Sequence, residues 1–393
     1  MKKTGTIIRA RPKYLGGINI LGNEALSDEK EYFFNSGSAA LKLFLIWLSK
    51  EQNKEIVIGM QAFNCKVVLD AAIEANCKVI LSDISLKYFS MTLSSVKKLV
   101  NQENIDVLLL THYQGIPNEE YQEIVGFCNE KNVLVIEDIS QTYGSSLNGI
   151  EVGSQGYAAL YSYAFDKPFT CMFGGSMKFN VNVKQSFKSL FSELFEESYK
   201  ESKHHLQILN FLWKYTNSDF YKDGVENYKA ISLLKIIGFN NSFIYFILSK
   251  NLLSLLISKT LSLINNFLFY KKIKIKKLHP MKIGLIKKQI ENFFYDKKGA
   301  EYFIKFCKDN SLEYPKYENQ SSIYWNRFSF IDDKSLVKKK LIKKGYQVSN
   351  YNWPITLDKL TKSHKVIILE DLDNSLYASK KILNVPIWNM YGK

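Results

Sequence analysis

Between residues 35 and 180 the chain alternates short apolar runs with segments of helical length. Apolar runs of this length are typical of buried strands, and helices between them indicate a mostly parallel sheet covered on both faces. The predicted strands are Ile56–Met60, Lys78–Ser82, Asp106–Leu110, Val133–Ile136, Ala158–Ser162 and Ser176–Phe179. Helical segments between them include Cys65–Ala75 and Glu119–Lys131. The sequence therefore predicts an α/β fold.

The rest of the chain divides by composition into three further units. Residues 1–34 contain Gly16, Gly17 and Gly22 and are expected to form an N-terminal arm. The large α/β domain is expected over residues 35–240, a hydrophobic and basic helical insertion over 241–280, and a smaller α+β domain over 281–393. The last of these carries helical patterns at Ala300–Asn310 and Ser335–Lys344 and strand-like residues at Ile323–Phe330.

The predicted insertion has two interpretations. Phe243–Phe269 places small polar residues on one helical face and leaves a wide apolar face opposite. A membrane-spanning helix is not expected, because Lys250 and Lys259 would lie inside, each at a cost of about 3 kcal/mol. Packing against the protein or a partner subunit is favoured over peripheral docking, in which the basic run Lys271–Lys277 would contact anionic headgroups.

Charge and cysteine content narrow the class of protein. The net charge of +15 is dispersed along the chain without zinc-finger spacing or RNA-recognition motifs, so nucleic acid is not an expected partner. Acidic small molecules or an anionic membrane surface fit this charge at least as well. Five separated cysteines without a CxxC pair, and only five histidines, indicate reduced thiols and no metal site. The basic N-terminus lacks the apolar core of a secretory signal. We therefore expect the protein in the cytosol, with or without peripheral contact at the inner face of the membrane.

Three chemically useful residues directly follow apolar runs. They are His112, Asp138 and Lys167. Ligands of parallel α/β sheets bind at the carboxyl ends of the strands, which is where these residues are expected. A lone lysine is usually a solvated surface charge, but Lys167 follows aromatic residues and precedes a glycine pair, Gly174–Gly175. That setting favours covalent chemistry on a carbonyl compound.

Other motifs allow a functional and a structural interpretation. The small residues of Asn35–Leu41 open an apolar helix, where they form either a phosphate cradle or an ordinary serine cap. Asp138 would pair with a protonated ring nitrogen or cap the next helix, and Gln141 would bond a ring substituent. Phe63 would lie flat on an aromatic cofactor or belong to the core.

In order and spacing these motifs resemble those of the DegT/DnrJ/EryC1/StrS family of sugar aminotransferases, which are pyridoxal 5'-phosphate (PLP) enzymes of fold type I. The resemblance covers about residues 33–180 and resumes more weakly from about 280 to the end. It is carried by Ile136–Gly144, Gly149, Val152–Ser154, Ser162 and Lys167 five residues apart, Gly174–Gly175, and the closing segment Leu383–Trp388.

The resemblance implies a role for each site residue. Lys167 would bind the cofactor aldehyde covalently and then move a proton between substrate carbon and cofactor. Asp138 would keep the ring nitrogen protonated, Phe63 would stack on the ring, and Gln141 would lie at the ring hydroxyl. Ser38, the Ala39 amide and Ser162 would bind the phosphate. The resemblance also implies glutamate as amino donor, a keto-sugar nucleotide as acceptor, a role in surface polysaccharide or amino-sugar biosynthesis, and a homodimer with the active site between subunits.

Several departures from the family pattern leave alternatives open. Gln61 replaces a usual proline and Ser140 a usual alanine, and the insertion replaces the region that supplies an asparagine to the neighbouring subunit. One alternative is a PLP-dependent sugar dehydratase of the same fold, although the family's dehydratases carry histidine where this chain has Lys167. The other is a degenerate, non-catalytic relative docked on a membrane.

Overall fold

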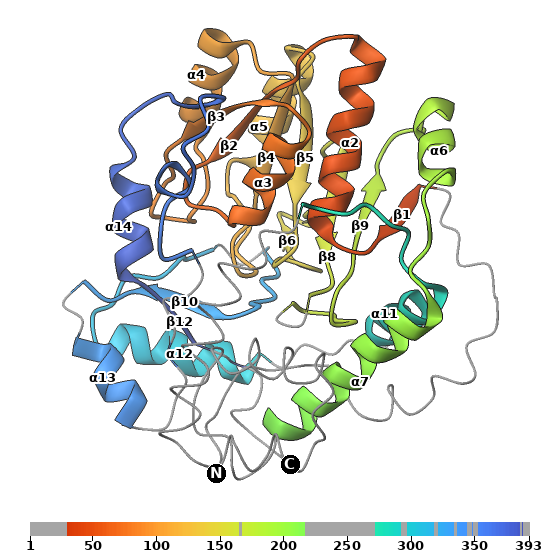
Figure 1. Ribbon diagram of the computed structural model, residues 1–393. Helices are drawn as coiled ribbons and strands as arrows, with labels where there is room; N and C mark the ends of the chain where they lie inside the picture. Colours follow the sequence, from red (N-terminus) through yellow and green to blue (C-terminus); the bar gives the residue numbers. More distant parts are fainter. Residues whose placement is uncertain are drawn as a thin grey trace.

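The computed structural model describes residues 30–164, 167–216, 272–291, 297–317, 321–333, 336–343, 348, 353–385 and 387. Their main element is an eight-stranded sheet of order β1-β9-β8-β5-β4-β2-β3-β11 (Figure 1). The strands are β1 (Glu31–Phe34), β2 (Val57–Gln61), β3 (Lys78–Ser82), β4 (Val107–Thr111), β5 (Leu134–Asp138), β8 (Ala158–Ser162), β9 (Gly175–Phe179) and β11 (Val366–Ile368). The run from β8 to β11 is parallel, whereas β9 is antiparallel to β8 and to β1.

All six predicted strands are present, within one or two residues of their expected bounds. The two outer strands were not predicted. Strand β1 comes from the end of the expected N-terminal arm, and β11 from the C-terminal part of the chain, so both ends of the described chain contribute to one sheet.

Helices cover both faces of the sheet, as the apolar strands predicted. Helices α2 (Gly37–Gln52) and α3 (Lys66–Glu74) pack on one face, and α4 (Leu93–Glu103) and α5 (Tyr121–Glu130) on the other. Alternate residues of β4 divide accordingly: Leu109 packs with α2 and α3, whereas Leu108 and Leu110 pack with α4 and α5. This two-sided burial explains why the strands are continuous apolar runs without a polar alternation.

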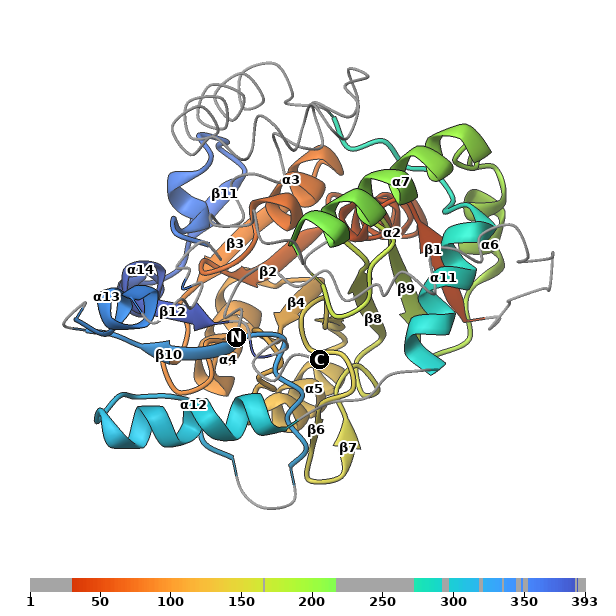
Figure 2. The ribbon, with the colours of Figure 1, turned by 90° about the horizontal axis from the view of Figure 1, so that it is seen from below.

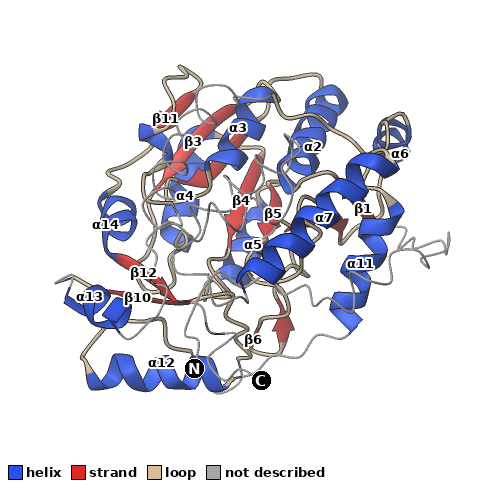
Figure 3. Cartoon of the chain, turned by 60° about the horizontal axis from the view of Figure 1, so that its bottom comes forward, coloured by secondary structure: helices blue, strands red, loops and turns tan. Residues whose placement is uncertain are grey.

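A second core lies beside the carboxyl ends of the strands (Figure 3). It contains an antiparallel pair, β10 (Phe328–Ile331) with β12 (Ile382–Val385), and the helices α12 (Lys298–Asp309), α13 (Leu336–Lys343) and α14 (Asp373–Lys381). The expected α+β character of this region is confirmed. Smaller elements are the hairpin β6 (Ser146–Leu147) and β7 (Ile150–Glu151), the 3-10 turn Leu357–Lys359, and the helices α6 (Gln185–Ser192), α7 (Tyr199–Thr216) and α11 (Pro280–Glu291).

Most of the predicted insertion, residues 241–271, lies outside the described part of the chain. The described end of its basic run is engaged with the protein: the Lys276 ammonium pairs with Glu201 at 2.8 Å, and the Lys277 ammonium donates to the Ser192 carbonyl at 2.7 Å. Ile273 and Ile275 pack against the large core. Among the residues that the structure describes, no helix is long and apolar enough to cross a membrane.

Candidate active site at the carboxyl edge of the large sheet

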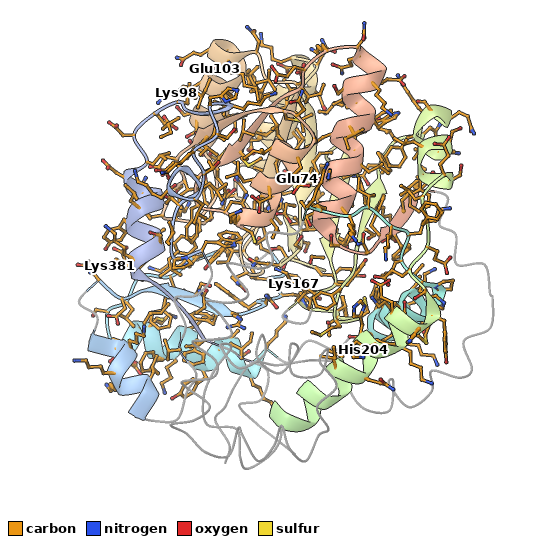
Figure 4. The ribbon with its side chains drawn as sticks, in the orientation of Figure 1. Glu74, Lys98, Glu103, Lys167, His204 and Lys381 are labelled. Carbon is orange, nitrogen blue, oxygen red and sulfur yellow. The ribbon has the colours of Figure 1, made fainter. Side chains whose placement is uncertain are left out.

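The predicted site residues gather at one edge of the large sheet. Ser162 ends β8 and Asp138 ends β5, its neighbour in the sheet, while Gln61 ends β2. Figure 4 labels Lys167 near the middle of the molecule, below the sheet in that view and between its edge and the lower helices. The parallel order of the strands brings these residues together, since it aligns their carboxyl ends.

The N-terminus of α2 forms a cradle of donors at this edge. Ser36 caps the helix, because its Oγ accepts from the Ala39 amide at 3.1 Å and lies 3.0 Å from the Ser38 Oγ. The predicted Ala39 donor is thus used within the cap. In the described part of the chain the amides of Gly37 and Ser38 have no acceptor, so the first turn offers N–H groups and hydroxyls together. Such a helix start favours an anion.

Two glycines allow the cradle to lie against the strand ends. A Cβ at Gly37 would lie 2.9 Å from the Tyr161 carbonyl oxygen and 3.6 Å from the Ser162 Cβ. A Cβ at Gly175 would lie 2.1 Å from the Gly37 nitrogen. Gly175 therefore meets the helix start backbone to backbone, which no other residue allows at this distance. The close approach places Ser162 beside the donors of α2.

The Asp138 carboxylate accepts hydrogen bonds from two residues, one of which is held by a third. Its Oδ1 accepts from the Ser140 amide at 3.1 Å, and its Oδ2 accepts from the Thr111 hydroxyl at 3.4 Å. Thr111 in turn accepts from the Asn64 side-chain amide at 2.9 Å. Asp138 is 5% exposed. A buried carboxylate held in one orientation is suited to pairing with a single cationic or N–H group.

Gln141 is held by the neighbouring strand end. Its Oε1 accepts from the Gln114 amide at 3.2 Å, and the Gln114 side chain accepts from Asn326 at 2.8 Å. Gln114 has a left-handed backbone, with φ of 53°, and is fully buried. Gly115 beside it would bring a Cβ to within 2.4 Å of the Tyr324 carbonyl oxygen. The second core thus contacts the site through Asn326 and Tyr324.

His112 and Glu137 form a buried pair at the ends of β4 and β5, and no role for Glu137 was expected from the sequence. The His112 Nδ1 accepts from the Asn118 amide at 3.0 Å, and its Nε2 lies 3.5 Å from the Glu137 carboxylate. Burial would raise the pKa of Glu137, but the nearby His112 imidazole and the hydrogen bonds from the Gly156 and Gly153 amides outweigh burial and lower that pKa. Glu137 precedes Asp138, so alternation along β5 turns the two carboxylates to opposite faces.

Phe63 lies in the second core. It is fully buried, with its ring centroid 5.3 Å from that of Tyr113 and 5.1 Å from that of Trp353. The Tyr113 hydroxyl lies 3.2 Å from the Asn384 Oδ1 on β12. Phe63 therefore has the packing expected of a core residue, and its stacking on a cofactor stays a prediction.

Lys167 differs from most lysines near the sheet. Its backbone amide donates to the Ala164 carbonyl at 3.2 Å, and its side chain is half-buried. Within the described residues its ammonium forms no ion pair, whereas Lys42, Lys54 and Lys78 each pair with a carboxylate. A half-buried amine without a counter-ion is available for covalent chemistry.

Four of the five cysteines are buried. Cys77, Cys128, Cys171 and Cys307 are free thiols. Burial raises the pKa of Cys77 and of Cys128 to about 12, so these thiols stay protonated. Among the described residues no group of histidine, cysteine and acidic side chains is arranged to hold a metal ion.

The sequence of the chain is similar to those of sugar aminotransferases. Residues 29–190 match the model of the DegT/DnrJ/EryC1/StrS aminotransferase family. A dTDP-4-dehydro-2,3,6-trideoxy-D-glucose 4-aminotransferase of Saccharopolyspora spinosa is 30% identical over 135 residues, which are 34% of either chain. The chain thus aligns with about a third of that relative's length.

Solved structures share the fold over nearly the whole chain. A DegT/DnrJ/EryC1/StrS aminotransferase from Brucella abortus has a TM-score of 0.62 at 12% identity, covering 97% of this chain and 91% of that one. An E. coli GDP-4-keto-6-deoxy-D-mannose-3-dehydratase with bound hydrated PLP has a TM-score of 0.61 at 16% identity, covering 98% and 94%. The sheet and its flanking helices therefore share the fold of these two structures, and residues 29–190 are similar in sequence to the DegT/DnrJ/EryC1/StrS aminotransferase family.

Proposed function

We propose that this protein is a PLP-dependent aminotransferase that moves an amino group from glutamate to a keto-sugar nucleotide, in surface polysaccharide or amino-sugar biosynthesis. The observation that carries the proposal is the convergence, at one sheet edge, of an anion cradle, a fixed carboxylate and a lysine that forms no ion pair with the residues that the structure describes, all within the segment that matches the family model. The S. spinosa relative is named as an aminotransferase of a nucleotide-linked sugar, which supports the substrate class. A homodimer in the cytosol, as in the family pattern, belongs to the same proposal.

The donor set fits PLP. The amides of Gly37 and Ser38, which have no acceptor among the described residues, would hold the phosphate together with the hydroxyls of Ser38 and Ser162. The helix dipole adds favourable charge there. The Asp138 carboxylate would hold a proton on the ring nitrogen, and Thr111 and Ser140 keep it oriented for that bond. Gln141 would hydrogen-bond the ring hydroxyl. The bound cofactor supplies an electron sink for the carbanion formed at the substrate carbon.

Lys167 would carry the covalent and proton-transfer steps. Its amine would hold the cofactor covalently at the aldehyde carbon, with the aldehyde oxygen lost as water, until a substrate amine replaces it there. The freed amine would then take a proton from the substrate carbon and return it to the cofactor carbon, or the reverse in the second half-reaction. These steps need an amine that is not locked in an ion pair, which is the state of Lys167 among the described residues.

The test begins with absorbance. Full-length protein mixed with PLP is expected to show a visible band, and borohydride reduction followed by peptide mass mapping is expected to place the cofactor on Lys167. Lys167→Ala should abolish the band, whereas Lys131→Ala, which changes an exposed lysine after α5, should leave it. Absence of a band in the wild-type protein contradicts the proposal and supports a non-catalytic relative.

Addition of glutamate separates transamination from dehydration. An aminotransferase is expected to lose the band when the amino group passes to the cofactor, and to recover it when a keto-sugar nucleotide is added. Mass spectrometry of the sugar should then show a gained amino group. A sugar that loses a hydroxyl without gaining nitrogen would instead establish the dehydratase alternative, whose fold the E. coli structure shares.

A further inference from the structure

The segment that carries Lys167 has a strained backbone. Met172, five residues after Lys167, is fully buried with φ of 76°, a left-handed conformation that side chains other than glycine rarely adopt. A Cβ at Gly174 would lie 2.6 Å from the Cys171 Sγ, so the turn is also tightly packed. Such a conformation persists only where surrounding groups hold it. The residues that hold it therefore decide where Lys167 lies.

Gln289 of α11 holds the segment at Thr170. Its Oε1 accepts from the Thr170 amide at 3.1 Å and its Nε2 donates to the Thr170 carbonyl at 2.9 Å. The side chain thus pairs with both backbone groups of one residue, as a neighbouring strand would. Its remaining N–H donates to the Leu285 carbonyl at 3.1 Å within its own helix. Gln289 is 6% exposed, so water does not replace these bonds.

Lys282 of the same helix holds the segment at Phe173. Its ammonium donates to the Phe173 carbonyl at 3.0 Å, while Glu197 accepts at 2.8 Å and the His205 Nδ1 at 2.9 Å. These three acceptors use the three donors of a lysine. The Lys282 and Glu197 side chains are 0% and 2% exposed. Burial and the Lys282 charge lower the pKa of His205 to about 3, so its imidazole is a neutral acceptor.

The two contacts come from one face of α11. Lys282 and Gln289 are seven residues apart, about two helical turns, which puts them on the same side. They reach Thr170 and Phe173, three and six residues after Lys167. Figure 1 and Figure 2 show α7, which carries His205, beside α11. Glu197, just before α7, pairs with Lys282 of α11. Lys282 thus connects α7 and α11 to the backbone of the turn at Phe173.

We propose that Lys282 and Gln289 are positioning residues, which hold the strained Lys167–Gly174 turn so that the Lys167 amine stays at the site. Neither residue contacts the predicted phosphate or ring ligands, so both act through the backbone of the turn. The catalytic consequence rests on the proposed function, because a displacement of about 1 Å in a reacting group lowers turnover by about 100-fold. The structural claim stands without it.

The experiment uses Gln289→Met, which keeps length and volume but leaves both Thr170 backbone groups without partners. Lys282→Met with Glu197→Gln removes the second contact without leaving a buried charge. Gln289→Glu keeps the acceptor for the Thr170 amide and is expected to rescue part of the effect. Lys288→Met, a half-buried lysine on the same helix, is the matched control.

The first measurement needs no cofactor. Hydrogen exchange of peptides covering residues 167–174 is expected to be at least about 10-fold faster in the two test variants, with peptides over β4 and β5 unchanged. The rate of reductive methylation of the Lys167 amine, measured by mass spectrometry, should also change in the variants whose hydrogen exchange is faster. Unchanged exchange in 167–174, or an equal rise throughout the sheet, would overturn the proposal; if Gln289→Met does not fold, Lys282→Met with Glu197→Gln decides by the same criterion.

The second measurement uses the PLP-loaded enzyme. The test variants are expected to lower kcat by about 10- to 100-fold with the sugar KM unchanged, because the ligand-binding residues are intact. A raised KM with normal kcat would contradict positioning of Lys167. A wild-type protein that does not bind PLP would refute the proposed function, while the exchange result would still decide the role of Lys282 and Gln289.

Discussion

Replacing Glu137 by glutamine tests whether a buried carboxylate supports the site. Its Oε1 accepts from the Gln155 amide at 2.9 Å and the Gly156 amide at 2.6 Å, and its Oε2 accepts from the Gly153 amide at 2.8 Å. Glutamine keeps the first oxygen but turns an NH₂ group toward the Gly153 amide, donor against donor. Since a hydrogen bond to a charged group contributes about 1.5–3 kcal/mol, we expect Glu137→Gln to lower the free energy of unfolding by about 3–5 kcal/mol.

Urea unfolding followed by circular dichroism measures this difference. Glu151→Gln, at an exposed position in the adjoining hairpin, is the control and should stay within about 0.5 kcal/mol of wild type. The lowered pKa of Glu137 also fixes the pH dependence. Its contribution is fully present above the ordinary pKa of 4.5 and is lost as pH falls through the lower folded value, so the two proteins should converge in acid. A difference below about 0.5 kcal/mol at pH 7, or one that persists unchanged in acid, would refute the reasoning.

Three further predictions concern the site and its surroundings. Gly175→Ala should cost about 3 kcal/mol in thermal or urea unfolding, because the new methyl group meets the α2 backbone, whereas Gly126→Ala, which meets nothing within 4 Å, should not destabilise the protein. Thr111→Val removes a hydroxyl donor to Asp138 and should weaken PLP about fivefold, equivalent to about 1 kcal/mol, in an absorbance titration; unchanged affinity would contradict the role of that bond. The pKa of His205 is lowered from 6.5 to about 3 by burial and by the lysine beside it, so the folded state binds fewer protons than the unfolded state in that range. Stability should therefore fall by about 2 kcal/mol between pH 6.5 and 5 in wild type but not in His205→Gln, and equal slopes would contradict the assignment.

The sequence alone was sufficient for the repeating part of the fold. The strands of the parallel sheet are short apolar runs, because both faces are buried, and that local pattern does not depend on distant residues. The same rule located the edge at which Asp138 and Ser162 lie, since ligands of such sheets bind at the carboxyl ends. Strands β1 and β11 escaped prediction because an edge strand of three or four residues has no distinctive pattern of its own.

Contacts between distant segments were decided only by tertiary structure. The sequence shows a glycine at position 175, but the close approach of its backbone to Gly37 depends on how the antiparallel β9 meets the start of α2. Phe63 follows a strand whether it stacks on a cofactor or belongs to the core. Only the tertiary packing brings it next to Trp353, which is far away in the sequence.

The position of Lys167 also depends on distant residues. The spacing of Lys167 from Ser162 and from Gly174–Gly175 can be read from the sequence, and the resemblance to a family rests on that spacing. The turn is held by two side chains on α11, more than a hundred residues later, and the sequence of that helix shows no local sign of this role. Hydrogen bonds to a strained backbone are specific in space but not in sequence, because any long polar side chain at the right place on the helix would form them.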